Sequence, residues 1–277
     1  MVAIEFPLPR TTVPPKTGPI LPDVLRSEWD KLRTVRSTYW TLFAAAATMI
    51  GLSAILCGIY VAQYAHLSAK DRALFDPASF SLTGSFLAQL AIGVLGVLVI
   101  TSEYGSGMIR STFAAVPQRL TVLAAKAAVF AAVTLVVTTA ASLAAFSVGQ
   151  MILSSKGIGV GLGAPGVLRT VIGTGLYLAV LGLLALSLGT IIRKTAGAIA
   201  AVFGLVLVLP TIAGLLPGSL SSVQKFLPSN AGLALVTGSH AGKTVPSLAP
   251  WIGFGVFCLY AVAALAVAGV ILVRRDA

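Results

Sequence analysis

The sequence contains little charge. Only 10% of its 277 residues are Asp, Glu, Lys or Arg, whereas soluble globular domains average about 25%. Hydrophobic residues make up 57% of the chain, and its mean hydropathy is +0.98. This composition excludes an ordinary soluble domain, and it favours a protein whose surroundings are the apolar interior of a bilayer.

Cysteine and histidine are also scarce, with two of each. Cys57 and Cys258 lie within apolar stretches, where cysteine acts as a small packing residue, so we expect free thiols rather than a disulfide. His66 and His240 are far apart in the sequence and have no cluster of carboxylates beside them. Such scattered residues do not make a metal site, so we expect no metal and no cofactor in this chain.

The sequence has no complete nucleotide-binding motif. Residues 238–244, GSHAGKT, are similar to the phosphate-binding loop GxxxxGK[ST], but the first glycine of that pattern would fall at position 237, which is Thr237. The flanking residues predict neither the preceding strand nor the following helix that such a loop requires. We therefore expect that this chain does not hydrolyse ATP.

Long apolar runs, by contrast, are abundant. Six of them reach the length of about 20 residues that a helix needs to cross a bilayer. They are continuous in Leu, Ala, Val and Ile and lack the period-2 alternation of a membrane β-barrel. The sequence predicts an all-α polytopic membrane protein, with spans at residues 39–62, 82–101, 124–148, 170–192, 196–216 and 251–273.

Basic residues are divided unevenly between the two ends of these spans. The positive-inside rule then predicts a cell (plasma or inner) membrane protein with both termini in the cytoplasm. It also explains the net charge of +11 without a nucleic-acid partner, because no basic patch is interleaved with aromatic residues. The predicted cytoplasmic side has eleven basic residues and the other side six: Arg26, Lys31, Arg33, Arg36, Arg110, Arg119, Lys126, Arg193, Lys194, Arg274 and Arg275 against Lys70, Arg72, Lys156, Arg169, Lys225 and Lys243.

Two segments precede the first predicted span. Residues 1–22 contain six prolines, which disfavour a helix, so we expect a disordered tail, with a docking peptide as the alternative. In residues 23–38, apolar side chains recur every three or four positions, which predicts an amphipathic helix along the membrane surface. Trp29, Tyr39 and Trp40 suit the interface. The six-span domain then comprises residues 39–277.

The connection between the second and third spans is the most informative part of the chain. Glu103 ends one apolar run, and Gly105 and Gly107 interrupt it. A short amphipathic piece follows at residues 108–115, and Pro117 stops it. Arg119 and Lys126 then open the third span.

This order of residues resembles the permease subunits of ATP-binding-cassette exporters of the type-2 (ABC-2) family. The resemblance implies a permease that exports a hydrophobic or amphipathic compound, such as a drug or a lipid, between two permease copies embedded in membrane lipids. It also implies two separate cassette ATPase subunits, which bind ATP and Mg²⁺ and dock on a coupling helix at about residues 104–116. The residues that this assigns to ATPase coupling are Gly105, Gly107, Met108, Ile109, Arg110 and Phe113, together with Glu28 and Arg33 of the amphipathic helix.

Glu103 is acidic at a membrane boundary, where an ionisable group is costly unless it is paired or hydrated. Several arginines lie on the same side, including Arg119, so we predict an ion pair, either a permanent one or one that breaks during transport. In the resembled family, spans one, two and five border the pathway. The corresponding pathway-lining candidates are Thr48, Ser85, Gln89, Phe203 and Pro210, although Gln89 could instead bond a neighbouring helix.

Two other functions fit parts of the pattern. A membrane-embedded lipid-modifying enzyme would need acids, histidines or metal ligands at one membrane depth, and the sequence shows no such set. A non-transporting sensor or assembly anchor bound to a cassette ATPase would keep the coupling segment, and only a transport assay separates it from a permease. Residues 217–250 form either a hairpin that dips into the membrane or a surface loop.

Overall fold

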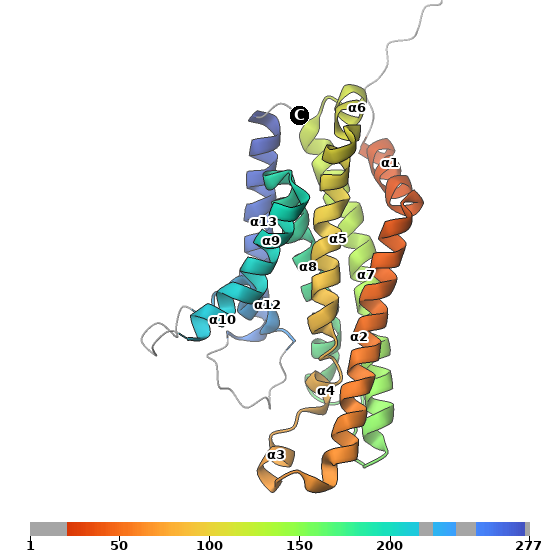
Figure 1. Cartoon of the computed structure of the whole chain (residues 1–277), viewed down its shortest axis with the longest axis vertical. Coiled ribbons are helices and arrows are strands. Elements are labelled where there is room, and N and C mark those ends of the chain that lie inside the picture. The colour runs from red at the N-terminus through yellow and green to blue at the C-terminus, as the bar shows by residue number, and fades with distance from the viewer. Residues whose placement is uncertain (1–20, 216–223, 237–247, 275–277) are drawn as a thin grey trace, which may run out of the picture.

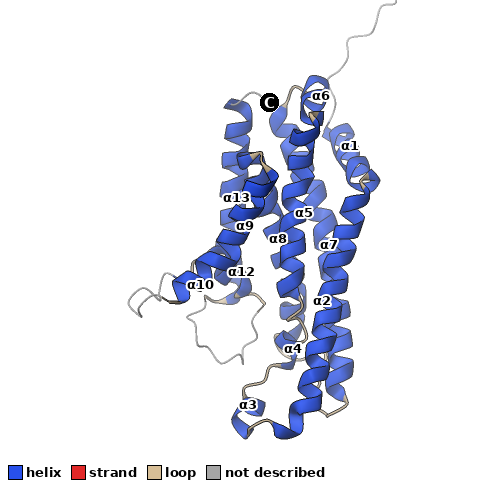
Figure 2. Ribbon diagram, in the orientation of Figure 1, coloured by secondary structure: helices blue, strands red, loops and turns tan. Residues whose placement is uncertain are grey.

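The computed structural model of the chain describes residues 21–215, 224–236 and 248–274 (Figure 1). All regular structure in these ranges is helical (Figure 2). Six helices are long and apolar enough to cross a membrane, so the chain is a multi-pass membrane protein and the predicted all-α, six-span fold class is confirmed. The spans are Arg36–His66, Ser85–Ser106, Arg119–Ser154, Val167–Ile192, Thr195–Gly214 and Pro250–Arg274.

Shorter helices connect or interrupt these spans. The elements in chain order are α1 (Leu21–Thr34), α2 (Arg36–Gln63), the 3₁₀ turn η1 (Tyr64–His66), α3 (Ala69–Ala73), α4 (Pro77–Phe80), α5 (Ser85–Ser106), α6 (Met108–Ala115), α7 (Arg119–Ser154), α8 (Val167–Ile192), α9 (Thr195–Phe203), the π-helix η2 (Gly204–Val208), α10 (Leu209–Gly214), α12 (Pro228–Leu233) and α13 (Pro250–Arg274).

The N-terminal boundaries differ from those predicted. Helix α1 begins at Leu21 and includes Pro22, which the sequence analysis assigned to the tail, because proline is tolerated in the first turn of a helix. The same helix ends at Thr34, and Val35 is extended (φ −79°, ψ 108°) before α2 begins at Arg36. The amphipathic helix is therefore separate from the first span and shorter than residues 23–38. Residues 1–20 lie outside the described part.

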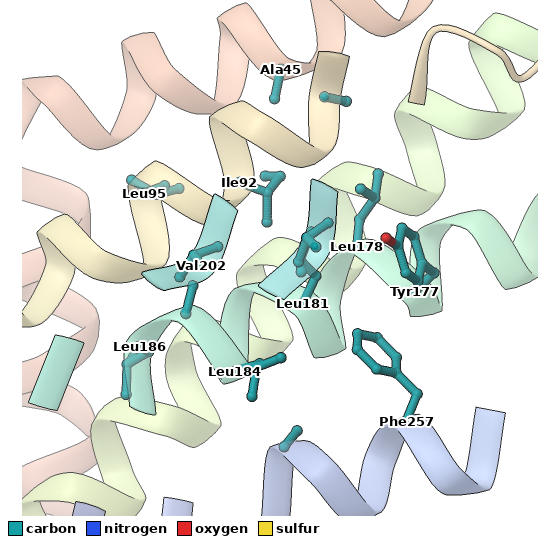
Figure 3. Close-up of a cluster of buried hydrophobic side chains, with 14 of the residues drawn as sticks. Ala45, Ile92, Leu95, Tyr177, Leu178, Leu181, Leu184, Leu186, Val202 and Phe257 are labelled. Carbon is teal, nitrogen blue, oxygen red and sulfur yellow. The ribbon is translucent and has the colours of Figure 1, made fainter. Parts of the chain in front are cut away.

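Helix α8 forms the centre of the bundle. It packs against α5, α7 and α13, and it is the most buried of the six spans. Its fully buried Tyr177 and Leu181 lie in a cluster with Ile92 of α5 and Phe257 of α13 (Figure 3). Helices in lipid associate through close packing rather than through a hydrophobic driving force, so the tightness of these contacts holds the bundle together.

The longest helix, α7, has 36 residues, which corresponds to about 54 Å at 1.5 Å per residue. The hydrocarbon core of a bilayer is about 30 Å thick, so α7 extends well beyond it. Helix α7 packs along α2, and both continue towards the end of the molecule that carries α3, whereas α1 and α6 lie at the opposite end (Figure 1). The spans therefore project from the membrane on at least one side.

The fifth span is not a uniform α-helix. It changes to a π-helix at Gly204–Val208 and returns to α at Leu209. Pro210 follows directly, and proline has no N–H to donate and its ring crowds the carbonyl four residues earlier, here that of Val206. The wider π turn accommodates that crowding, and π turns occur often at functional sites.

Part of the connection between the fifth and sixth spans packs inside the bundle. Within the described residues 224–236, Ala231 and Leu235 are fully buried, and α12 packs against α13. This stretch is not a solvated loop, although whether it lies within the membrane stays a prediction. The remainder of the connection, including the GSHAGKT segment and His240, lies outside the described residues. Cys57 and Cys258 are free thiols, as expected.

Candidate functional site

The chain leaves the second span through a glycine turn. Gly107 has φ +74° and caps α5 in the left-handed region, with its N–H donating to the carbonyl of Tyr104. Glycine adopts this conformation without the strain that a Cβ adds. Gly105, which the sequence analysis also assigned to the break, is instead part of α5. The change of direction therefore depends on Gly107, and α6 begins at the next residue.

Helix α6 has the predicted extent, from Met108 to Ala115, but its apolar face points inward. Ile109 is only 3% exposed, and Phe113 packs against Val24 of α1 and the start of α7. Ile109 and Phe113, which the sequence analysis assigned to ATPase coupling, therefore anchor α6 to the bundle. The side chains on the outer surface of α6 are Met108, Arg110, Ser111, Ala114 and Ala115.

Four charged side chains from three helices meet behind α6. Lys126 of α7 lies 2.5 Å from a carboxylate oxygen of Glu28 in α1 and 2.6 Å from one of Glu103 in α5. Lys31 lies 2.6 Å from Glu28 and 3.4 Å from the same oxygen of Glu103 that Lys126 contacts. Two acids and two bases make this charge cluster formally neutral. It joins α1, α5 and α7 at one point.

The charge cluster is buried. The side chains of Lys126, Glu28 and Glu103 are only 3% to 4% exposed, and that of Lys31 is 24% exposed. Removing a charge from water is costly unless an opposite charge replaces its hydration. The two carboxylates raise the pKa of Lys31, which outweighs the lowering that burial causes. Each member of the cluster therefore replaces hydration that its neighbours lose on burial, and loss of one leaves the remaining charges unbalanced.

Lys31 also connects the charge cluster to α6. Its ammonium lies 3.4 Å from Thr112 Oγ1 and donates to it. The other oxygen of Glu103, Oε2, is buried without a hydrogen-bond partner among the described residues. A small cavity of about 140 Å³ lies beside the cluster, with Glu103, Lys31 and Lys126 in its wall. A displacement of α6 would act on the cluster through Lys31 and through the packing of Phe113.

The structure gives Glu103 lysine partners rather than the arginines considered from sequence. Arg119 instead donates from Nη1 to the carbonyl of Leu272 in α13, at 3.0 Å, and its guanidinium carbon lies 5.5 Å from the centre of the Phe113 ring. Glu28, predicted as an ATPase contact, is buried in the charge cluster and cannot reach a partner directly. Arg33 is exposed, as a docking residue must be.

Three of the five pathway candidates line one cavity. Ser85, Gln89 and Pro210 border a cavity of about 450 Å³ between α5, the fifth span and α12. Gln89 is buried and accepts a hydrogen bond from the Tyr177 hydroxyl at 2.8 Å, so the alternative of a bond to a neighbouring helix is the one seen. Thr48 and Phe203 are not in this cavity wall. Thr48 is exposed on α2, where its hydroxyl donates to the carbonyl of Ala44.

Sequence reasoning missed the roles of Lys31, Lys126 and Tyr177. For Lys126 a signal was present, since it lies inside an otherwise apolar predicted span and a charge there needs a partner. No pattern in the sequence identified Glu28 as that partner, because the two residues are 98 positions apart. Within the described ranges, no group of three or more His, Cys, Asp or Glu side chains could hold a metal ion.

The fold and site define a polytopic helical membrane protein with a short helix held against the ends of its spans. Residues 24–211 match the profile of the ABC-2 family transporter proteins. This match covers more than half of the chain, so the chain belongs to the ABC-2 family, as its resemblance indicated, and is the membrane component of a transporter. A comparison with curated proteins gave no match.

Proposed function

We propose that this chain is the permease subunit of an ATP-binding-cassette exporter, driven by separate cassette ATPase subunits that bind ATP and Mg²⁺. The observation that carries the proposal is the way α6 is built. Its outer surface presents Arg110 and Met108 to a partner, while Ile109 and Phe113 fix its inner surface to the spans. A helix anchored in this way moves together with the spans when a partner displaces it.

The charge cluster would transmit movement of α6 to the membrane-spanning helices. Lys31 touches Thr112 on α6 and both carboxylates of the cluster, and Lys126 joins these carboxylates to α7. Movement of α6 would therefore tilt α5 and α7 together with α1. Because a buried charge is costly without a partner, Glu103 could change partners only in a discrete step, which is the switching role considered for it.

The substrate would pass beside the cavity of about 450 Å³ that Ser85, Gln89 and Pro210 line. Its wall combines apolar side chains such as Phe86 with polar ones such as Gln89 and Asn230, as sites for amphipathic small molecules do. This supports a hydrophobic or amphipathic substrate, such as a drug or a lipid. We further propose a homodimer of permeases with two ATPase copies, in a plasma or inner membrane, with both termini and α6 in the cytoplasm.

The proposal is tested with the chain and its co-purifying cassette ATPase in vesicles, where ATPase rate and efflux of an amphipathic fluorescent dye are measured together. Arg110→Glu should lower both by about fivefold or more, because a reversed charge at a docking contact costs on the order of 1–3 kcal/mol. Lys70→Glu is the matched control, since Lys70 is an exposed cation at the opposite end of the spans.

Normal ATPase rate and normal efflux in the Arg110→Glu protein would contradict coupling through α6. ATPase binding without efflux of any substrate tried, in the wild-type complex, would instead support the sensor or anchor function.

A further inference from the structure

Another cavity, larger than the one that Gln89 lines, lies away from the candidate pathway. It is a groove of about 660 Å³ between the start of α7 and the C-terminal half of α13. Buried Leu123 and Gly269 form its floor, and exposed Leu120, Val262 and Val270 form its rims. The volume is within the range of about 300–1,000 Å³ that is usual for ligand sites. In lipid, such an apolar groove is filled by hydrocarbon rather than by water.

Among the described residues that line the groove, the single charged one lies at one end. Arg274 lines it there and is exposed. Arg119 holds the same end of α7 to α13 through its hydrogen bond to the Leu272 carbonyl. The rest of the wall is apolar, so the groove joins one cationic end to a hydrocarbon surface. That polarity matches a phospholipid with an anionic headgroup.

The length of the groove also fits one lipid tail. From Val262 to Arg274 the helix advances by twelve residues, or about 18 Å. One leaflet of the hydrocarbon core is about half of 30 Å. A chain that starts at a headgroup beside Arg274 would therefore reach roughly the middle of the bilayer at Val262.

We propose that this groove is a binding site for one acyl chain of an anionic phospholipid, whose phosphate pairs with Arg274. Basic pockets between membrane helices are a recognised form of lipid site, and a basic residue near an anionic lipid surface contributes about 1 kcal/mol. A bound lipid of this kind would hold the sixth span against the third. Arg274, the cation at the end of the groove, is complementary to an anionic headgroup, and this favours an anionic lipid as the occupant.

The test is native mass spectrometry of the full-length protein after detergent exchange, with added phosphatidylglycerol or phosphatidylcholine of identical chains. The wild-type protein should retain phosphatidylglycerol in preference. Ala266→Phe should lose the retained lipid, because Ala266 lines the groove and is exposed, so the ring fills the groove without disturbing the core. The matched control Val267→Phe, at an exposed neighbour outside the groove wall, should retain lipid as the wild type does.

The Arg274→Gln protein should still bind a lipid acyl chain. Its preference for phosphatidylglycerol over phosphatidylcholine should fall by about fivefold, the factor that corresponds to about 1 kcal/mol. If the Ala266→Phe and Val267→Phe proteins retain equal amounts of lipid, the lipid is bound around the protein and not in the groove, and the proposal is overturned. A dimer fraction that falls in Ala266→Phe while lipid retention is unchanged would assign the groove to a second copy and would also overturn it. Permease activity is not needed for either readout, so failure here leaves the proposed function standing.

Discussion

Lys126 holds its ammonium between buried carboxylates of two other helices. Removing the charge with Lys126→Met should lower the free energy of unfolding by about 3–5 kcal/mol, because two buried carboxylates, Glu28 and Glu103, would then have only Lys31 between them. The measurement is denaturant unfolding of the protein in mixed micelles. Arg33→Met is the control at an exposed cation on α1 and should change stability by less than about 0.5 kcal/mol.

Adding Glu28→Gln and Glu103→Gln to Lys126→Met should recover part of the loss, since the one charge of the cluster that then remains is that of Lys31, whose side chain is 24% exposed. If Lys126→Met alone is as stable as the wild type, the cluster does not hold α1, α5 and α7 together.

Gly107 and Gly105 form a natural pair for testing the turn before α6. Both have open space where a Cβ would lie, but only Gly107 has a positive φ, +74°. Gly107→Ala should therefore destabilise the protein by about 1–2 kcal/mol through backbone strain. Gly105→Ala lies in α5 and should be neutral or stabilise by up to about 1 kcal/mol. Equal melting temperatures for the two variants would contradict the assignment of the turn to Gly107.

At the scale of elements, the spans were predictable because continuous apolar length depends only on composition along the chain. All six runs became helices, and α6 appeared at residues 108–115. Contacts between elements were not predictable in this way. The sequence could not show that Ile109 and Phe113 face inward, because an amphipathic helix has an apolar face whether it meets a partner or its own bundle.

The sequence also does not show which glycines lie at contacts between helices. Gly51 and Gly96 are both glycines inside apolar spans, yet a Cβ on Gly51 would meet nothing within 4 Å, whereas one on Gly96 would lie 2.4 Å from the carbonyl oxygen of Gly182. Gly96→Ala should therefore force α5 away from α8 and cost about 1–3 kcal/mol. Gly51→Ala is the matched control and should be neutral or stabilise by up to about 1 kcal/mol, as expected for Gly105→Ala. Both are measured as the fraction that remains monodisperse after heating in detergent, and equal fractions would contradict the close approach of the two helices.

The whole molecule has two unlike ends. Helices α1 and α6 and the C-terminal end of α13 lie at one end, and α3 lies at the other (Figure 1). The excess of Lys and Arg at the first end predicts that it faces the cytoplasm, and an ATP-consuming partner could reach α6 only from that side. The orientation and the coupling proposal therefore depend on each other.

Cysteine labelling in intact cells tests this orientation. In a background with Cys57→Ala and Cys258→Ala, Lys70→Cys should react with a membrane-impermeant maleimide, because Lys70 is exposed in α3. Arg274→Cys, equally exposed at the end of α13, should react only after the cells are permeabilised. The positive-inside bias, eleven basic residues against six, is the physical reason for this difference. Reaction of Arg274→Cys but not Lys70→Cys in intact cells would invert the topology, place α6 outside, and remove the coupling role proposed for Arg110 with it.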